Sequence, residues 1–184
     1  MRKLNIAYGN SRQAKMWVNN TVSFDDLKER LKVTIRTTES VEEYAKMSRS
    51  MLALDGDRID AAFLENYETL SPYTSALYTT HSSTVENPRV RLVFPLTRDV
   101  APDEFVAVSR YLAEALGIDY FDECSYQPNQ LMYWPSTPAN GSFVYKETDG
   151  GWLDPDEILS RHPEWTDPTR LPTSSRESKA NTTA

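Results

Sequence analysis

The sequence contains very few residues that bind soft metals or form covalent cross-links. Cys124 is the only cysteine, and His81 and His162 are the only histidines. A single thiol excludes both an intrachain disulfide and a cysteine-based zinc site. Any bound metal ion must therefore be held mainly by carboxylates, which favours Mg²⁺ or Mn²⁺ over zinc.

Long apolar runs and two common catalytic motifs are also missing. No stretch approaches the roughly 20 apolar residues that a membrane-spanning helix needs. Residues 1–5 lead into a strand-like segment without the apolar core of a signal peptide, so we expect a cytoplasmic protein. The chain has neither a Gly-x-Ser-x-Gly elbow nor a Gly-x-x-x-x-Gly-Lys phosphate-binding loop. The second absence indicates that this chain is not itself a helicase.

The net charge of −7 is unevenly distributed along the chain. Residues 1–100 carry 14 Lys and Arg against 13 Asp and Glu, whereas residues 101–184 carry 6 against 14. The first part can still present a basic face. The overall charge therefore neither indicates nor excludes binding to nucleic acid.

The length and the apolar pattern predict one α+β domain. Without regular strand–helix alternation, a sheet packed by helices on one face is favoured. From residue 172 onward the sequence is polar and aperiodic, so we expect a domain over residues 1–171 and a flexible tail or linker over residues 172–184. Strands are predicted over residues 4–8, 51–54, 76–79, 90–96, 131–134 and 143–145, and helices over about 23–32, 40–47, 60–70 and 102–116 and from residue 154.

The first candidate site residues are two acids at the end of an apolar strand. Asp55 and Asp57 are two residues apart, so they point to the same side, with β-carbons roughly 6–7 Å apart. Both carboxylates can then hold one or two divalent ions, and Gly56 leaves room for a phosphate. An Asp-Gly-Asp turn with purely local hydrogen bonding is the alternative, which the motif alone leaves open.

A histidine follows the next predicted strand. His81 lies between hydroxyl side chains in residues 78–83 and can donate a hydrogen bond to a phosphate oxygen. Arg89 and Arg91 share one face of the following strand and can reach the same triphosphate. Taken alone, the pattern favours a surface turn whose neighbouring arginines pair with nearby acids.

Asp122, after the apolar residue Phe121, adds a third carboxylate. A paired acid, a Thr-x-His turn and a lone acid thus occur in the order of the three active-site motifs of the archaeo-eukaryotic primase (AEP) superfamily, which this sequence resembles. It is most similar to the primase-like N-terminal domain of prophage primase-helicases of the virulence-associated protein E type. The segments that carry the similarity are residues 9–12, 17–19, 49–55, 78–82, 88–96 and 131–136.

The resemblance implies an AEP fold, in which helices pack on an RRM-like antiparallel sheet. It also implies that two divalent ions, Mg²⁺ or Mn²⁺, are held by carboxylates, and that basic side chains contact the nucleotide. The implied metal ligands are Asp55, Asp57 and Asp122, with Asp119 as a poorer candidate for the third. The implied nucleotide contacts are His81, Arg89 and Arg91, with Arg12 and Lys15 as nucleotide or template contacts.

The implied activity is template-directed nucleotidyl transfer by a DNA primase or primase-polymerase. Its partners would be a single-stranded DNA template, nucleoside triphosphates and a helicase module, in the same longer protein or on a separate chain, during phage or mobile-element replication. The sequence departs from the family pattern at Gln130, where a basic residue is common, and at residues 47–50, where relatives have a longer basic stretch. A catalytically inactive nucleic-acid-binding module and a metal-dependent nuclease remain alternatives.

Overall fold

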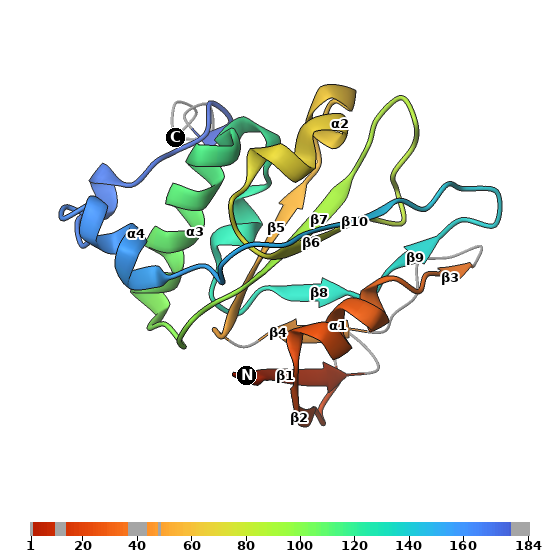
Figure 1. The fold of residues 1–184 in the computed structure, drawn as a ribbon, viewed down its shortest axis with the longest axis horizontal. Coiled ribbons are helices and arrows are strands. Elements are labelled where there is room, and N and C mark those ends of the chain that lie inside the picture. Colours follow the sequence, from red (N-terminus) through yellow and green to blue (C-terminus); the bar gives the residue numbers. More distant parts are fainter. Residues whose placement is uncertain (1, 10–13, 37–43, 48, 178–184) are drawn as a thin grey trace.

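The computed structural model describes residues 2–9, 14–36, 44–47 and 49–177 (Figure 1). Strands and helices are mixed along these residues, as the apolar pattern predicts. The strands are β1 (Leu4–Gly9), β2 (Val18–Val22), β3 (Ile35–Arg36), β4 (Tyr44–Met47), β5 (Met51–Gly56), β6 (Ser75–Thr79), β7 (Val90–Pro95), β8 (Leu131–Tyr133), β9 (Ser136–Thr137) and β10 (Tyr145–Thr148). The α-helices are α1 (Phe24–Leu31), α2 (Ala61–Leu70), α3 (Pro102–Leu116) and α4 (Pro155–Arg161).

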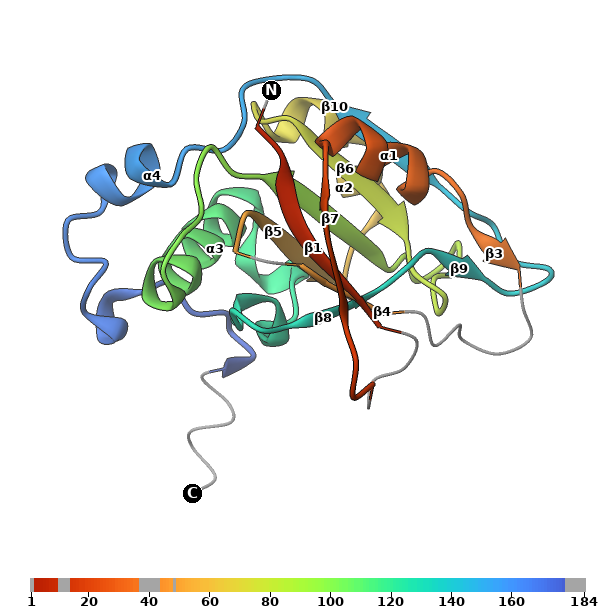
Figure 2. The same cartoon turned by 90° about the horizontal axis from the view of Figure 1, so that it is seen from below.

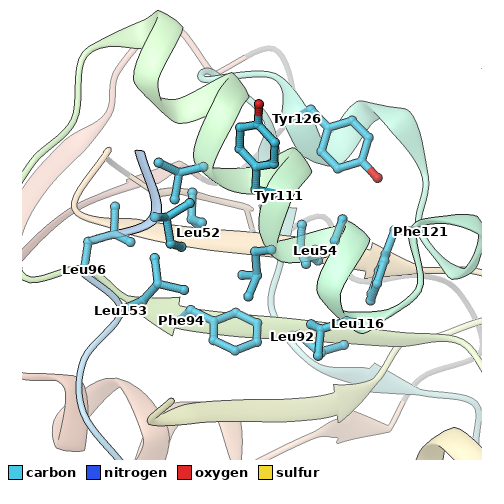
Figure 3. Packing of buried hydrophobic residues seen from close by; sticks show 14 of the residues in the cluster. Leu52, Leu54, Leu92, Phe94, Leu96, Tyr111, Leu116, Phe121, Tyr126 and Leu153 are labelled. Carbon is cyan, nitrogen blue, oxygen red and sulfur yellow. The ribbon is translucent and has the colours of Figure 1, made fainter. Parts of the chain in front are cut away.

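A central antiparallel sheet has the strand order β10-β6-β7-β5. Its two faces are both apolar because side chains alternate along each strand. Leu52, Leu54, Leu92 and Phe94 point to the face that α2 and α3 cover, where they pack with Phe121 and other buried residues (Figure 3). This layer forms the larger of the two cores.

The opposite face of the central sheet is covered by α1 and by a second sheet, with the order β2-β1-β4-β8 (Figures 1 and 2). Phe24 and Leu27 of α1 and Leu4 of β1 pack there against Tyr78 and Val93 of the central sheet. Val93 lies between Leu92 and Phe94, so β7 contributes to both cores. The central sheet is therefore enclosed between two layers.

Local sequence signals explain how the main helices begin and end. Ser23 and Asp26 form the reciprocal hydrogen bonds of a capping box at the start of α1. Pro102 occupies the first turn of α3, and Gly117 ends that helix with a φ of 102°, a left-handed conformation that glycine adopts readily. Both helices confirm the prediction.

No helix in the described part of the chain is long and apolar enough to cross a membrane.

The helix predicted over residues 40–47 is wrong where the structure describes it. Residues Tyr44–Met47 form strand β4, which pairs with β1 on one side and β8 on the other. Two sets of inter-strand hydrogen bonds outweigh a capping-box pattern, because that pattern contributes only locally. Residues 40–43 lie outside the described residues. The last predicted strand begins later than expected, at Tyr145 instead of residue 143.

We predict that the larger core depends on Leu92, which is fully buried in the middle of the central sheet. Leu92→Ala removes apolar contacts and leaves a cavity, so it should lower the free energy of unfolding by about 3 kcal/mol. Urea denaturation measures the change. As a control, Val85→Ala alters a residue that is 79% exposed and should cost less than about 0.5 kcal/mol. Equal effects of the two substitutions would contradict the assignment of Leu92 to the core.

Candidate active site

A cavity of about 430 Å³ lies at the edge of the central sheet where β5 and β6 end and β7 begins between them. Its lining includes side chains from β5, β7 and the connecting segments on either side of them. The cavity brings together six of the residues that the sequence singled out: Asp55, Asp57, His81, Arg89, Arg91 and Asp122.

The end of β5 is where the acids are positioned. Asp55 lies in the strand, and the segment before Asp122 pairs with the strand end through a bridge between Gly56 and Phe121. The Asp122 N–H donates to the Asp55 carbonyl at 2.8 Å, and the Asp57 N–H donates to the Tyr120 carbonyl at 3.2 Å. These backbone contacts hold the third acid next to the first two.

Gly56 lies in close packing, in addition to the predicted room that it leaves for a phosphate. An added β-carbon would lie 2.7 Å from the side chain of Ile59 and 3.0 Å from that of Val90. Both residues belong to the larger core. Close packing under the strand end therefore explains why a glycine separates the two acids.

Asp55 forms an ion pair with Arg91, which faces it across the β5–β7 ladder. Arg91 also donates from Nη1 to the Tyr133 carbonyl at 3.1 Å. Burial alone would lower the pKa of Arg91, but the negative charge of Asp55 and the hydrogen bond with Tyr78 raise it. Arg91 is 6% exposed, so its positive charge is a permanent, buried feature of the cavity wall.

Asp57 is paired with a residue that the sequence gave no reason to select. Arg176 donates from Nη1 and Nη2 to the two carboxylate oxygens of Asp57, at 2.8 and 3.0 Å. It also donates to the Phe121 carbonyl at 3.1 Å. Arg176 lies in the aperiodic segment from residue 172 onward, of which residues 172–177 contact the domain here. The boundary between domain and tail stays a prediction.

Asp122 caps the short 3₁₀ helix that follows it, by accepting from the Cys124 N–H at 2.8 Å. The thiol of Cys124 lines the cavity beside it. A hydrogen bond to Asp122, together with burial, raises the pKa of Cys124. Ser125 is buried next to it and accepts from the Asp55 N–H at 2.8 Å. Neither Cys124 nor Ser125 belongs to the predicted site, because their roles depend on the turn that brings them back to β5.

His81 is oriented by a serine from another part of the chain. The Ser136 hydroxyl lies 3.2 Å from Nδ1 of His81. Ser136 is buried in β9, which pairs in parallel with β3. This contact orients the imidazole ring through Nδ1 at the wall of the cavity. Ser136 ends the last of the segments that carry the resemblance, but its spacing from His81 gives no sign of the contact.

The profile of the VapE N-terminal domain family matches residues 1–51 and 47–174. This chain belongs to that family. A comparison with curated proteins gives no significant match.

A comparison with solved structures shows which known fold this VapE N-terminal domain shares. It is similar to the AEP domain of the cyanophage S-2L primase-polymerase (PrimPol), with 11% identity, a TM-score of 0.50, and coverage of 85% of this chain and 88% of that one. It also matches primase RepB′, with 10% identity and a TM-score of 0.47 over 98% of this chain, and spans 62% of that chain. The expected AEP primase fold is confirmed.

The carboxylates of the VapE N-terminal domain are a suitable donor set for a hard cation. Three of them line one cavity, and two already bind guanidinium groups, which shows that the site attracts positive charge. As the side chains stand, no group of three or more His, Cys, Asp or Glu in the described residues is arranged to hold a metal ion. For one metal ion to be bound by all three acids, Asp57 would have to release the guanidinium of Arg176.

Two further predicted residues lie outside this arrangement, and a third is not among the described residues. Lys15 is exposed and does not line the cavity, and Arg12 lies outside the described residues. Asp119, the poorer candidate for the third acid, accepts from the Ser175 N–H at 2.7 Å and is not part of the cavity lining. Gln130, where relatives often carry a basic residue, does line the cavity.

We predict that Asp55 and Asp57 contribute very differently to the free energy of unfolding. Asp55→Asn leaves the buried charge of Arg91 without its partner and should lower the free energy of unfolding by about 3 kcal/mol. The pair of Asp57 and Arg176 is about a quarter exposed on both sides, so Asp57→Asn should cost about 1 kcal/mol or less. Chemical denaturation of the two variants tests the difference, and equal losses would contradict a structural role for the buried pair.

Proposed function

We propose that this domain is a DNA primase or primase-polymerase, which adds nucleotides to a growing strand on a single-stranded DNA template. The observation that supports this most strongly is one cavity, on an AEP fold, that contains Asp55, Asp57, Asp122, His81 and Arg91. Acids for cations and basic groups for phosphates are the two requirements of nucleotidyl transfer.

The acids would bind two divalent ions, Mg²⁺ or Mn²⁺, through Asp55, Asp57 and Asp122. When bound, such ions lower the pKa of a primer 3′-hydroxyl and stabilise the departing pyrophosphate. The protein contributes position: Asp55 is fixed by strand pairing, and Asp122 by its backbone hydrogen bond to Asp55. Rigid placement of this kind supplies much of the rate in phosphoryl-type transfers.

The nucleotide triphosphate would lie between the acids and His81. The contact with Ser136 orients the imidazole, so that Nε2 can donate to a phosphate oxygen. Arg89 is exposed where it lines the cavity and can follow the triphosphate. Arg91 is committed to Asp55 and the Tyr133 carbonyl, and would act on the phosphates through its buried charge.

The template is single-stranded DNA, and the domain works with a helicase module in the same longer protein or on another chain. This part of the proposal rests on membership of the VapE N-terminal domain family. Arg12 and Lys15 are the proposed additional contacts to template or nucleotide. The setting would be replication of a phage or mobile element in the cytoplasm.

Primer synthesis tests the proposed reaction directly. With single-stranded DNA, labelled nucleotides and Mn²⁺, the wild-type domain should produce extended products, and Asp122→Asn should reduce them about 100-fold. Asparagine still caps the 3₁₀ helix, so this change removes the charge with little loss of structure. Asp25→Asn is the matched control because Asp25 is exposed on α1 and does not line the cavity. Shortened template would instead indicate a nuclease, and DNA binding without products an inactive module.

We predict that a substitution of His81 weakens nucleotide binding more than a substitution of its partner Ser136. His81→Asn removes one charge-assisted hydrogen bond of about 1.5 kcal/mol and should raise the KM for nucleotide about tenfold. Ser136→Ala leaves the imidazole in place without its orienting partner, so its KM should rise less, by about threefold. Steady-state extension kinetics measure both values. A larger effect of Ser136→Ala than of His81→Asn would contradict the proposal that His81 contacts the nucleotide and that Ser136 only orients it.

A further inference from the structure

Residues 172–177 are attached to the domain by a closed network of polar contacts. Arg110 of α3 donates to the Pro172 carbonyl at 2.7 Å and to the carboxylate of Glu177 at 2.8 and 3.1 Å. Glu177 in turn accepts from the Ser174 N–H at 3.0 Å, and the Ser175 N–H donates to Asp119. The segment therefore has a defined position at the rim of the candidate active site.

This network places the guanidinium of Arg176 on the carboxylate of Asp57. Both oxygens of Asp57 accept a hydrogen bond from it, and the Phe121 carbonyl accepts another. The hydrogen bonds to Asp57 raise the pKa of Arg176 despite partial burial, so the group stays charged. A cation of the chain itself occupies the acid that the proposed function assigns to a divalent metal ion.

A guanidinium and a divalent ion compete for Asp57 in this geometry. Both carboxylate oxygens are engaged, and two positive groups a few ångströms apart repel each other strongly in a partly buried site. We propose that Arg176 competes with the divalent cation for Asp57, so that Arg176 must move away from Asp57 before all three acids can hold the metal. This inference rests on the proposed function, which makes Asp57 a metal ligand.

Residues 172–177 are attached to the domain by contacts that can break and form again. Ser174 is its only fully buried residue, and its contacts are hydrogen bonds and ion pairs rather than an apolar face. The pair of Arg176 and Asp57 is about a quarter exposed, whereas the pair of Arg110 and Glu177 is more buried. A segment held by polar contacts at the surface can open locally without unfolding the domain. Metal binding and release of the segment then favour each other, because the bound metal and the attached segment exclude each other at Asp57.

Mn²⁺ affinity of the full chain, measured from the spectrum of free Mn²⁺ by electron paramagnetic resonance, tests the competition. Arg176→Ala should bind Mn²⁺ about three- to tenfold tighter than the wild type, the range expected for loss of one partly exposed ion pair. Arg170→Ala is the matched control. Arg170 is 70% exposed and paired only weakly with Asp167, so its loss should leave the affinity unchanged.

A second variant separates displacement from a simple change of charge. Glu177→Ala loosens the segment from Arg110 but removes a negative charge from the chain. Long-range electrostatics alone would then weaken Mn²⁺ binding, whereas release of Arg176 should strengthen it. Hydrogen exchange gives a readout without any variant: added Mn²⁺ should accelerate exchange of the amides of Ser174 and Ser175 in the wild-type protein.

The outcomes distinguish this inference from the proposed function. Unchanged or weaker Mn²⁺ binding by Arg176→Ala, or weaker binding by Glu177→Ala, overturns the competition even if primers are made. Tighter binding by both variants in a protein that makes no primers supports the competition and overturns the polymerase assignment. Absence of Mn²⁺ binding in every variant overturns both.

Discussion

The ion pair between Asp55 and Arg91 is the interaction on which the rest of the structure depends. It joins β5 to β7 at the cavity wall, and the hydrogen bond from Arg91 to the Tyr133 carbonyl extends it to β8 of the second sheet. It also fixes the register of the central sheet. A slip of one residue would turn Arg91 into the core formed by Leu92 and Phe94, where a charge cannot be solvated.

The same pair divides the candidate site into a rigid part and an exchangeable part. Asp55 is held by strand pairing, by Arg91 and by the hydroxyl of Ser125. Asp57 lies just beyond the strand and is held by backbone pairing and by Arg176, which comes from a polar segment. Two acids that look equivalent in the sequence thus have different freedom, because one is inside the sheet and the other outside it.

The sequence predicts what depends on local or strand-level patterns. Short apolar runs predict β5, β6 and β7, and local signals such as capping residues predict α1 and α3, so Asp55 and Arg91 are placed on the correct strands. It fails where long-range pairing decides. Tyr44–Met47 is a strand because two neighbours pair with it. Ser136 contacts His81 and Arg176 contacts Asp57 from segments whose own residues carry no periodic signal. The roles of the site residues remain predictions.

The environment of Cys124 has a practical consequence. Its pKa is raised by the neighbouring carboxylate of Asp122 and by burial, so little of it is the reactive thiolate at neutral pH. It is also the only cysteine of the chain. A new cysteine at an exposed position would therefore react preferentially with maleimide dyes or spin labels, which makes the unaltered protein a suitable background for spectroscopic reporters.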